Sequence, residues 1–176
     1  MEAGGHRGAF DSGEADRQMA GLIALLPQVV DAVALPVIAT GGIADARGVA
    51  AALILGASAV QIGTGFLRSP EAGTPPAYAN RLAQTEAHDT MVTRAFSGRP
   101  GRSVATAYTR AALNAPPPAP YPVQRGLTSA MRESARKAGD TERMQMWAGQ
   151  AASFALAEPA GVIARKLWDG ASRLLS

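Results

Sequence analysis

The chain has 176 residues with a net charge of +3, and 47% of them are hydrophobic, a composition typical of a globular protein. The absence of cysteine excludes disulfides, thiol nucleophiles and cysteine-based metal sites, and no apolar run approaches the ~20 residues of a membrane-spanning helix. The basic residues, nearly all arginine, are scattered among acids, which argues against nucleic-acid binding. We therefore expect a cytoplasmic protein without a nucleic-acid or membrane partner.

Residues 1–13 hold four glycines and His6, and we expect a loop there rather than a helix or strand. Glycines on both sides of His6 let the backbone approach a ligand closely. Imidazole titrates near neutral pH, so His6 is a candidate general base. An exposed loop histidine without a function explains the same residues equally well. Apolar residues at helical spacing then predict a helix over 18–33, and Pro27 either starts it or divides it into two short helices.

Residues 36–72 are expected to form a strand, a helix and a second strand. The apolar run 37–39 predicts a parallel strand that is buried on both faces and ends at Gly41 and Gly42. The second strand, 59–62, breaks in the same way at a glycine–threonine–glycine turn. Such a βαβ unit places both glycine turns at the same edge of the sheet.

The edge after these strands is a candidate phosphate site. Barrels of alternating strands and helices place their active sites there, and the loops after strands seven and eight often bind phosphate. Glycine lets backbone N–H groups approach phosphate oxygens, and Thr64 can add a hydroxyl. One such turn would be explained by tight turning alone, whereas two turns one βαβ unit apart favour phosphate binding. Asp45 is predicted to cap the intervening helix and Gly56 to end it.

The remaining elements are predicted mostly as helices. Helices are expected over 75–87, 103–113, 124–138, 141–157 and 159–174, with a short strand over 91–96, a basic turn over 97–102 and a proline-rich connector over 115–122. His88 is expected to pair with the dipole at a helix end. The three residues Arg94, Arg99 and Arg102 could bind an anion or cap helix carbonyls, and the sequence does not separate these roles.

Several catalytic patterns are absent from the sequence. There is no zinc-binding HExxH motif, no nucleophile elbow, no phosphate-binding GxxxxGK[ST] loop and no cluster with metal-ligand spacing. Gln61 could donate its amide to a ligand, or it could be an interior polar residue paired with the backbone. From the residues alone, the phosphate site and His6 are the leading candidates for a functional site.

Six motifs then point to a known family. In chain order they are EAGGHRG, PVIATGGIADARG, GASAVQIGTGFLRSPEA, TRAFSGRPGR, PAPYPVQ and MWAGQ. Each is weak alone, but together, from Glu2 to Gln150, they closely resemble the flavin-dependent nitronate monooxygenases, once called 2-nitropropane dioxygenases. The resemblance implies FMN as cofactor and oxidation of an alkyl nitronate or nitroalkane by O₂ to a carbonyl compound and nitrite.

The same resemblance implies an α/β fold: the C-terminal part of an FMN-binding TIM (β/α)₈ barrel with a helical extension. Residues 1–72 would hold the last two strands, the catalytic loop and the phosphate site, and residues 73–176 the last barrel helix and the helical region. By position, His6 resembles the family's catalytic histidine, a base toward neutral nitroalkanes. The residues implied to bind the cofactor are Gly4, Gly5, Gly41, Gly42, Gln61, Ile62, Gly63 and Thr64. Gly149 and Gln150 are also expected to approach it, and no metal ligand is implied.

The chain departs from the family at its start. In these enzymes EAGGHRG follows the sixth barrel strand, so we expect a truncated chain that lacks strands one to six, much of the flavin site and most of the substrate pocket. Two parallel strands cannot close a barrel. The alternatives are a related FMN barrel, such as a flavin-dependent enoyl reductase using NAD(P)H, or a non-catalytic remnant. In either case the missing N-terminal barrel half is the expected partner.

Overall fold

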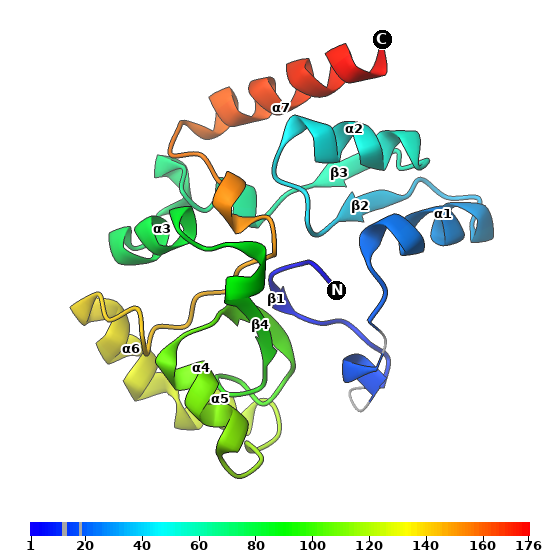
Figure 1. Cartoon of the computed structure of the whole chain (residues 1–176). Coiled ribbons are helices and arrows are strands. Elements are labelled where there is room, and N and C mark those ends of the chain that lie inside the picture. Colours follow the sequence, from blue (N-terminus) through cyan, green and yellow to red (C-terminus); the bar gives the residue numbers. More distant parts are fainter. Residues whose placement is uncertain (12–13, 18) are drawn as a thin grey trace.

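The computed structural model describes residues 1–11, 14–17 and 19–176 (Figure 1). Its strands are β1 (Gly5–His6), β2 (Ile38–Thr40), β3 (Ala59–Gln61), β4 (Thr90–Thr93) and β5 (Gly101–Val104). Its α-helices are α1 (Leu22–Ala32), α2 (Ala46–Ile54), α3 (Pro76–Ala83), α4 (Ala107–Ala111), α5 (Val123–Leu127), α6 (Ser129–Ala138) and α7 (Ala160–Leu175). This content confirms the α/β class.

The predicted βαβ unit is present. β2 and β3 run parallel, with Ile38 opposite Ala59, and α2 connects them. The Asp45 carboxylate caps α2 by accepting a hydrogen bond from the Gly48 amide at 2.9 Å. Gly56 follows the helix with φ +96°, the left-handed conformation that glycine adopts at a helix end. Both predicted helix boundaries are therefore confirmed.

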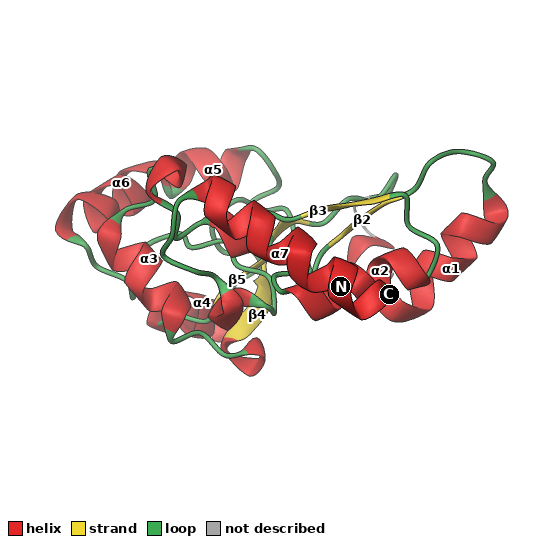
Figure 2. Ribbon diagram, turned by 90° about the horizontal axis from the view of Figure 1, so that it is seen from above, coloured by secondary structure: helices red, strands yellow, loops and turns green. Residues whose placement is uncertain are grey.

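The expectation that the first strand is buried on both faces is wrong. Ala39 points toward α2 and is 2% exposed, whereas the neighbouring Ile38 is 59% exposed. Successive side chains of a strand point to opposite faces, so only one face of this sheet is covered. In Figure 2, α2 and α7 lie on one side of β2 and β3, and no described helix covers the other side.

Two helices complete the packing around this unit. α1 is one continuous helix with Pro27 inside it, so the alternative of two short helices is wrong. α7 lies along α2 on its outer side (Figure 1), and the helix predicted over 159–174 is confirmed. The predicted division into residues 1–72 and 73–176 stays a prediction. α7, which belongs to the second of these parts, packs on α2 in the first. The buried core here contains Leu26, Ala39, Ile43, Val49, Ala50, Ala52, Ala57 and Ala171.

A second sheet, in the order β1–β5–β4, is antiparallel. Residues 1–13 were expected to be a loop, but Gly5 and His6 form β1 and pair with Arg102 and Gly101. The helix predicted over 103–113 is partly wrong, because β5 occupies its beginning and only α4 is helical. The predicted strand over 91–96 lies within and just after β4, and the helix predicted over 124–138 is α5 followed by α6.

The helix predicted over 141–157 is wrong in a way that matters for the site. Residues 146–148 run antiparallel to β5, where the Met146 carbonyl accepts hydrogen bonds from the Val104 amide at 2.9 Å and the Ser103 hydroxyl at 2.8 Å. The Tyr78 hydroxyl donates to the Trp147 carbonyl. Burial raises the pKa of Tyr78, so this hydroxyl stays protonated. Pairing with β5 thus replaces the internal hydrogen bonds of a helix.

No helix within residues 1–11, 14–17 and 19–176 has the length and apolar content needed to cross a bilayer. The described residues also contain no group of three His, Asp or Glu side chains placed to hold a metal ion.

The cap at Asp45 gives a direct test of this fold. Asp45→Ala should lower the free energy of unfolding by about 1 kcal/mol, because an amide in the first turn of α2 loses its acceptor. Asp45→Asn keeps an oxygen acceptor and serves as the control. Urea denaturation followed by circular dichroism measures both. Equal losses in the two variants would assign the effect to the Arg47–Asp45 ion pair rather than to the cap.

Candidate functional site

His6 stands at the end of β1 against buried and aromatic neighbours. Its Nε2 lies 2.7 Å from the Oγ of Ser97, a residue that is 1% exposed. The Trp147 ring meets the imidazole edge-on with centroids 5.1 Å apart, and the Tyr121 ring does so at 5.7 Å. These contacts hold the imidazole plane, although one side of the residue remains exposed to solvent.

The electrostatics around His6 favour its neutral form. Burial, followed by the positive charges of Arg99 and Arg125, lowers the pKa of His6 below its ordinary value of 6.5. At neutral pH the ring is therefore uncharged and keeps one nitrogen lone pair for accepting a proton. This is the protonation state that a general base requires.

A small cavity of about 90 Å³ lies where β2 and β3 end. Its lining includes six of the eight residues expected to bind a cofactor, together with Gly149. The lining residues are Ala3, Gly4, Thr40, Gly41, Gly42, Ile43, Gln61, Gly63, Thr64, Gly149 and Ala151. We call this space the glycine cavity. The structure thus brings together the two glycine turns, as expected, and adds the chain's first residues and the 146–150 segment.

The local conformation explains why glycines line this cavity. Gly41 has φ +103° and Gly42 has φ +71°, values that favour glycine. Gly4 approaches the backbone so closely that a Cβ there would lie 2.6 Å from the Gly149 nitrogen. Gly63 differs, since its φ is −98° and a Cβ there would meet nothing within 4 Å. The space that a side chain at Gly63 would enter is therefore empty.

The chemistry of the glycine cavity fits a phosphate group. No charged side chain lines it; the nearby Glu2 carboxylate lies beside Gly42, where a Cβ would meet its Oε2 at 3.3 Å, and accepts a hydrogen bond from the Leu22 amide. The Thr64 Oγ1 accepts a hydrogen bond from the Gly149 amide at 3.0 Å, which leaves its own hydrogen for a ligand oxygen. Backbone in left-handed and turn conformations can present N–H groups to an anion. The residues present therefore suit the phosphate end of FMN.

A larger cavity of about 520 Å³ adjoins the first one and shares Ala3 and Thr40 with it. We call it the histidine cavity, because His6 lines it; the remaining lining residues are Met1, Arg7, Gly8, Met19, Ala20 and Leu25. A ligand with a phosphate in the glycine cavity can therefore extend toward His6. This arrangement is suited to an elongated cofactor and a small substrate.

Not every predicted site residue lines these cavities. Gly5 has φ +82° and only its neighbour Gly4 lines the glycine cavity. Ile62 packs against the core beneath the strands. The Gln61 carbonyl accepts the Thr40 hydroxyl at 3.0 Å, while the Gln61 side chain is exposed at the cavity. The backbone N–H of Gln150 donates to the Glu2 carbonyl at 2.9 Å, and Gln150 does not line the glycine cavity.

Three neighbours of His6 were not predicted as site residues. Ser97, Tyr121 and Trp147 come from segments 91 or more residues away in the sequence. The only available signal was that each lies inside one of the six family-like motifs. Spacing alone could not have placed them beside His6.

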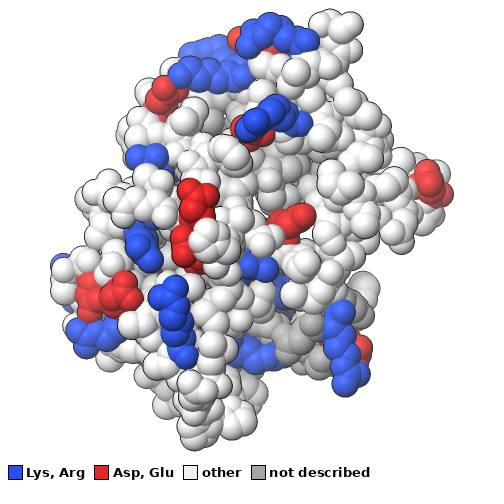
Figure 3. Space-filling view, viewed as in Figure 1, with Lys and Arg blue, Asp and Glu red and all other residues white. Residues whose placement is uncertain are grey.

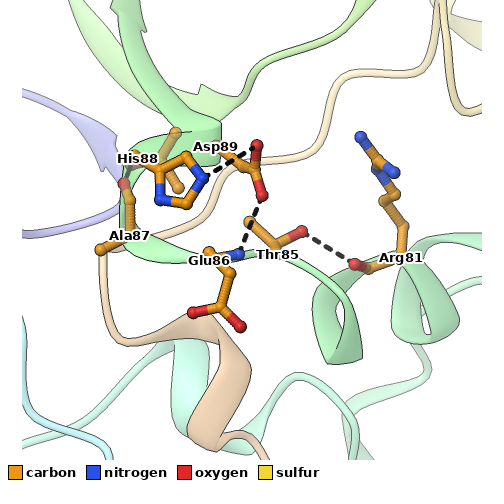
Figure 4. Close-up of polar contacts among 7 residues, drawn as sticks. Arg81, Thr85, Glu86, Ala87, His88 and Asp89 are labelled. Carbon is orange, nitrogen blue, oxygen red and sulfur yellow. Dashed lines mark hydrogen bonds and ion pairs between the residues drawn. The ribbon is translucent and has the colours of Figure 1, made fainter.

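The second histidine and the basic loop have structural contacts instead. The helix predicted over 75–87 ends earlier, at Ala83, and the exposed His88 ring lies 3.9 Å from the Asp89 carboxylate in a separate short turn (Figure 4). Arg99 donates to the Arg7 carbonyl at 3.1 Å. Arg102 is 6% exposed and donates to the Met1 carbonyl at 3.1 Å and to Thr90. These two arginines bind loop and strand carbonyls rather than the helix carbonyls considered above.

Comparison with known proteins agrees with these features. The sequence profile of nitronate monooxygenase matches residues 1–168. A probable nitronate monooxygenase of Staphylococcus aureus strain Newman is 41% identical over 163 residues, which are 92% of this chain and 46% of that protein. Nitroalkane oxidase from Streptomyces ansochromogenes has a TM-score of 0.87 and 43% identity, over 100% of this chain and 52% of that one. FabK from Thermotoga maritima has a TM-score of 0.77 and 31% identity, over 99% of this chain and 53% of that one.

The chain thus spans about half the length of the relatives it matches. Within that half, the match runs through the His6 strand, both glycine turns and the 146–150 segment. The similarity therefore covers the complete set of features that form the two cavities described above. The chain belongs to the nitronate monooxygenase family.

Proposed function

We propose that this chain forms the histidine-bearing and phosphate-binding part of an FMN-dependent enzyme that oxidises alkyl nitronates with O₂ to a carbonyl compound and nitrite. The observation that carries this proposal is the contact between the two cavities, which share Thr40 and Ala3 and end at His6. A cofactor phosphate and a proton-accepting imidazole would then lie within one elongated space. The family resemblance supplies the reaction class.

The glycine cavity would hold the FMN phosphate through the backbone of the glycine turns and the Thr64 hydroxyl. Gly41 and Gly42 bring the main chain close to the ligand, and Gln61 adds an amide at the cavity wall. Bound there, FMN supplies the redox chemistry that passes electrons from the substrate to O₂. The isoalloxazine end would reach toward the histidine cavity.

His6 would act on the substrate proton. The Ser97 hydroxyl can donate to the Arg99 carbonyl at 3.2 Å. In the tautomer protonated at Nε2, the Ser97 oxygen would accept from His6 and Nδ1 would keep the free lone pair. Nδ1 then accepts the proton of a neutral nitroalkane carbon, and the C–H electron pair moves into the nitro group to give the nitronate. Trp147 and Tyr121 restrict the ring to one orientation during this step.

A related FMN barrel of the enoyl reductase type is the second candidate, and the similarity to FabK fits it. The two candidates differ in their products. Nitrite released in proportion to nitronate consumed supports the first, and NAD(P)H oxidation that depends on an unsaturated thioester, without nitrite, supports the second.

Gly63 tests the glycine cavity. Gly63→Val should weaken FMN binding by about tenfold or more, because its branched side chain enters the cavity without straining the backbone. Gly126→Ala, on the exposed side of α5, is the matched control and should bind FMN as the unchanged chain does. Quenching of flavin fluorescence during titration measures both. Unchanged affinity in the Gly63 variant would place the phosphate elsewhere.

The pKa of His6 tests its electrostatic environment. In a ¹H–¹³C NMR titration, His6 should titrate below 6.5, and Arg99→Gln should raise its pKa because one of the opposing charges is removed. Arg110→Gln on α4 removes a charge that does not act on His6 and is the control. Loss of one signal in His6→Asn assigns the resonance. A His6 pKa at or above 6.5 would contradict the proposed neutral base.

The proton-transfer role predicts a difference between substrates. In the assembled enzyme, His6→Asn should lower kcat/KM for neutral nitroethane by about 10²–10⁴-fold, the range for removing a general base. Ethyl nitronate has already lost its proton and should be affected less. Nitrite release measures turnover, and the visible flavin spectrum checks that FMN remains bound. If flavin is lost in this variant, His6 has a structural role instead.

A further inference from the structure

We propose that Glu2 is a positioning residue of the phosphate site: its side chain fastens the first glycine turn, Gly41 and Gly42, to the start of α1. The turn thereby keeps the conformation in which both glycines line the glycine cavity. Glu2 itself does not line this cavity and would not touch the phosphate. The inference rests on the proposed function in one respect, since the ligand of the turn is the FMN phosphate.

Glu2 and Ala3 pack directly on the two glycines of this turn. A Cβ on Gly42 would lie 3.0 Å from the Glu2 Cβ and 3.3 Å from its Oε2, and a Cβ on Gly41 would lie 2.9 Å from the Ala3 Cβ. Glycine has access to a wide range of backbone conformations, so two consecutive glycines do not hold one conformation by themselves. The shape of the turn therefore depends on the side chains that contact it.

The Glu2 carboxylate is also bound to the start of α1. Its Oε2 accepts a hydrogen bond at 2.9 Å from the amide of Leu22, the first residue of the helix. The N-cap residue, Gly21, has no side chain that could do this, and the first turn contains no acidic residue. The surface around α1 is largely uncharged on the face seen in Figure 3. A carboxylate from 20 residues earlier thus caps the helix, where the partial positive charge of the helix end favours it.

The backbone around Glu2 is held independently of its side chain. The Glu2 carbonyl accepts a hydrogen bond from the Gln150 amide at 2.9 Å, and the neighbouring Met1 carbonyl accepts one from Arg102 Nε at 3.1 Å. Removal of the Glu2 side chain is therefore expected to leave β1 and His6 in place. The effect of such a change falls on the turn and on α1.

The turn has little packing behind it. A cavity of about 340 Å³ shares Gly41, Gly42, Ile43 and Ala151 with the glycine cavity, so the turn forms part of the wall between the two. This second cavity is lined mainly by apolar residues of α1 and α2, and among the described residues Glu2 is the one charged residue that lines it. Because a cavity offers no atoms for van der Waals contact, the Glu2 side chain is the link that joins the turn to α1 across this space.

The charge of Glu2 and its position have opposite effects on phosphate binding. A carboxylate near a phosphate weakens binding by Coulomb repulsion, whereas the contacts of the side chain with the turn and with α1 strengthen it. Glu2→Gln separates the two effects, because it keeps a side-chain oxygen for the Leu22 amide and removes the charge. If position is what matters, the Gln variant binds FMN at least as tightly as the unchanged chain.

The test compares FMN with riboflavin, which lacks the phosphate, by quenching of flavin fluorescence on residues 1–176. Glu2→Ala should weaken FMN binding about fivefold to tenfold, the range for losing one capping hydrogen bond, and should leave riboflavin binding unchanged. Glu2→Gln should restore FMN binding. Glu133→Ala on α6 removes an exposed carboxylate that pairs with Lys137, and it is the matched control. An equal loss of affinity for both flavins in Glu2→Ala would overturn the proposal.

A double variant separates the turn from the helix. Gly21 has the extended conformation of an N-cap, with φ −73° and ψ 155°, so Glu2→Ala combined with Gly21→Ser supplies α1 with a local cap. Hydrogen exchange of the first turn of α1 should return to that of the unchanged chain. FMN binding should stay weak, because nothing in the double variant replaces the contact with Gly42. Recovery of FMN binding would show that Glu2 acts only as a helix cap and would overturn the proposal.

Hydrogen exchange of residues 38–44, measured by mass spectrometry without any flavin, separates the failure of this inference from the failure of the proposed function. Exchange in this segment should be faster in Glu2→Ala than in Glu2→Gln or the unchanged chain. Equal exchange in all three overturns the positioning role, whatever the flavin affinities are. Faster exchange in Glu2→Ala, together with an unchanged chain that binds FMN no more tightly than riboflavin, supports the positioning of the turn and contradicts the proposed phosphate site.

Discussion

The site depends on where the backbone of residues 146–150 finds its hydrogen bonds. Buried N–H and C=O groups must be paired, and this segment pairs with three different parts of the chain. It joins β5 through Met146, the second glycine turn through Gly149 and Thr64, and the first residues of the chain through Gln150 and Glu2. The strand that carries His6 and the edge that carries the glycine turns are thereby fixed relative to each other.

This connection also unites the chemistry of the two cavities. The same segment that completes the glycine cavity places Trp147 against the His6 ring, and the Ser97 hydroxyl lies within hydrogen-bond distance of the ring Nε2. Burial and the positive charges of Arg99 and Arg125 lower the pKa of His6, while the Arg99 guanidinium donates to the Arg7 carbonyl. Anion binding and proton acceptance therefore share one framework, although they use different residues.

Local sequence signals predicted the parts of this structure that local interactions determine. The βαβ unit, the cap at Asp45 and the ending at Gly56 were all predictable because capping and turn preferences act within a few residues. The helix expected over 141–157 failed because pairing with β5, more than 40 residues away along the chain, outweighs helical periodicity. The position of Ser97 beside His6 has the same origin. The two-sided burial expected for the strand of Ile38 failed because the described residues supply a cover for only one face.

Among the residues that the structure describes, β2 pairs with β3 alone, so each strand has one unpaired edge beside the exposed Ile38, and this matters inside a cell. Exposed strand edges beside apolar side chains promote aggregation, and proteins that open such surfaces are removed by chaperones and proteases. A chain in which this face and these edges stay open is therefore expected to aggregate or to be degraded.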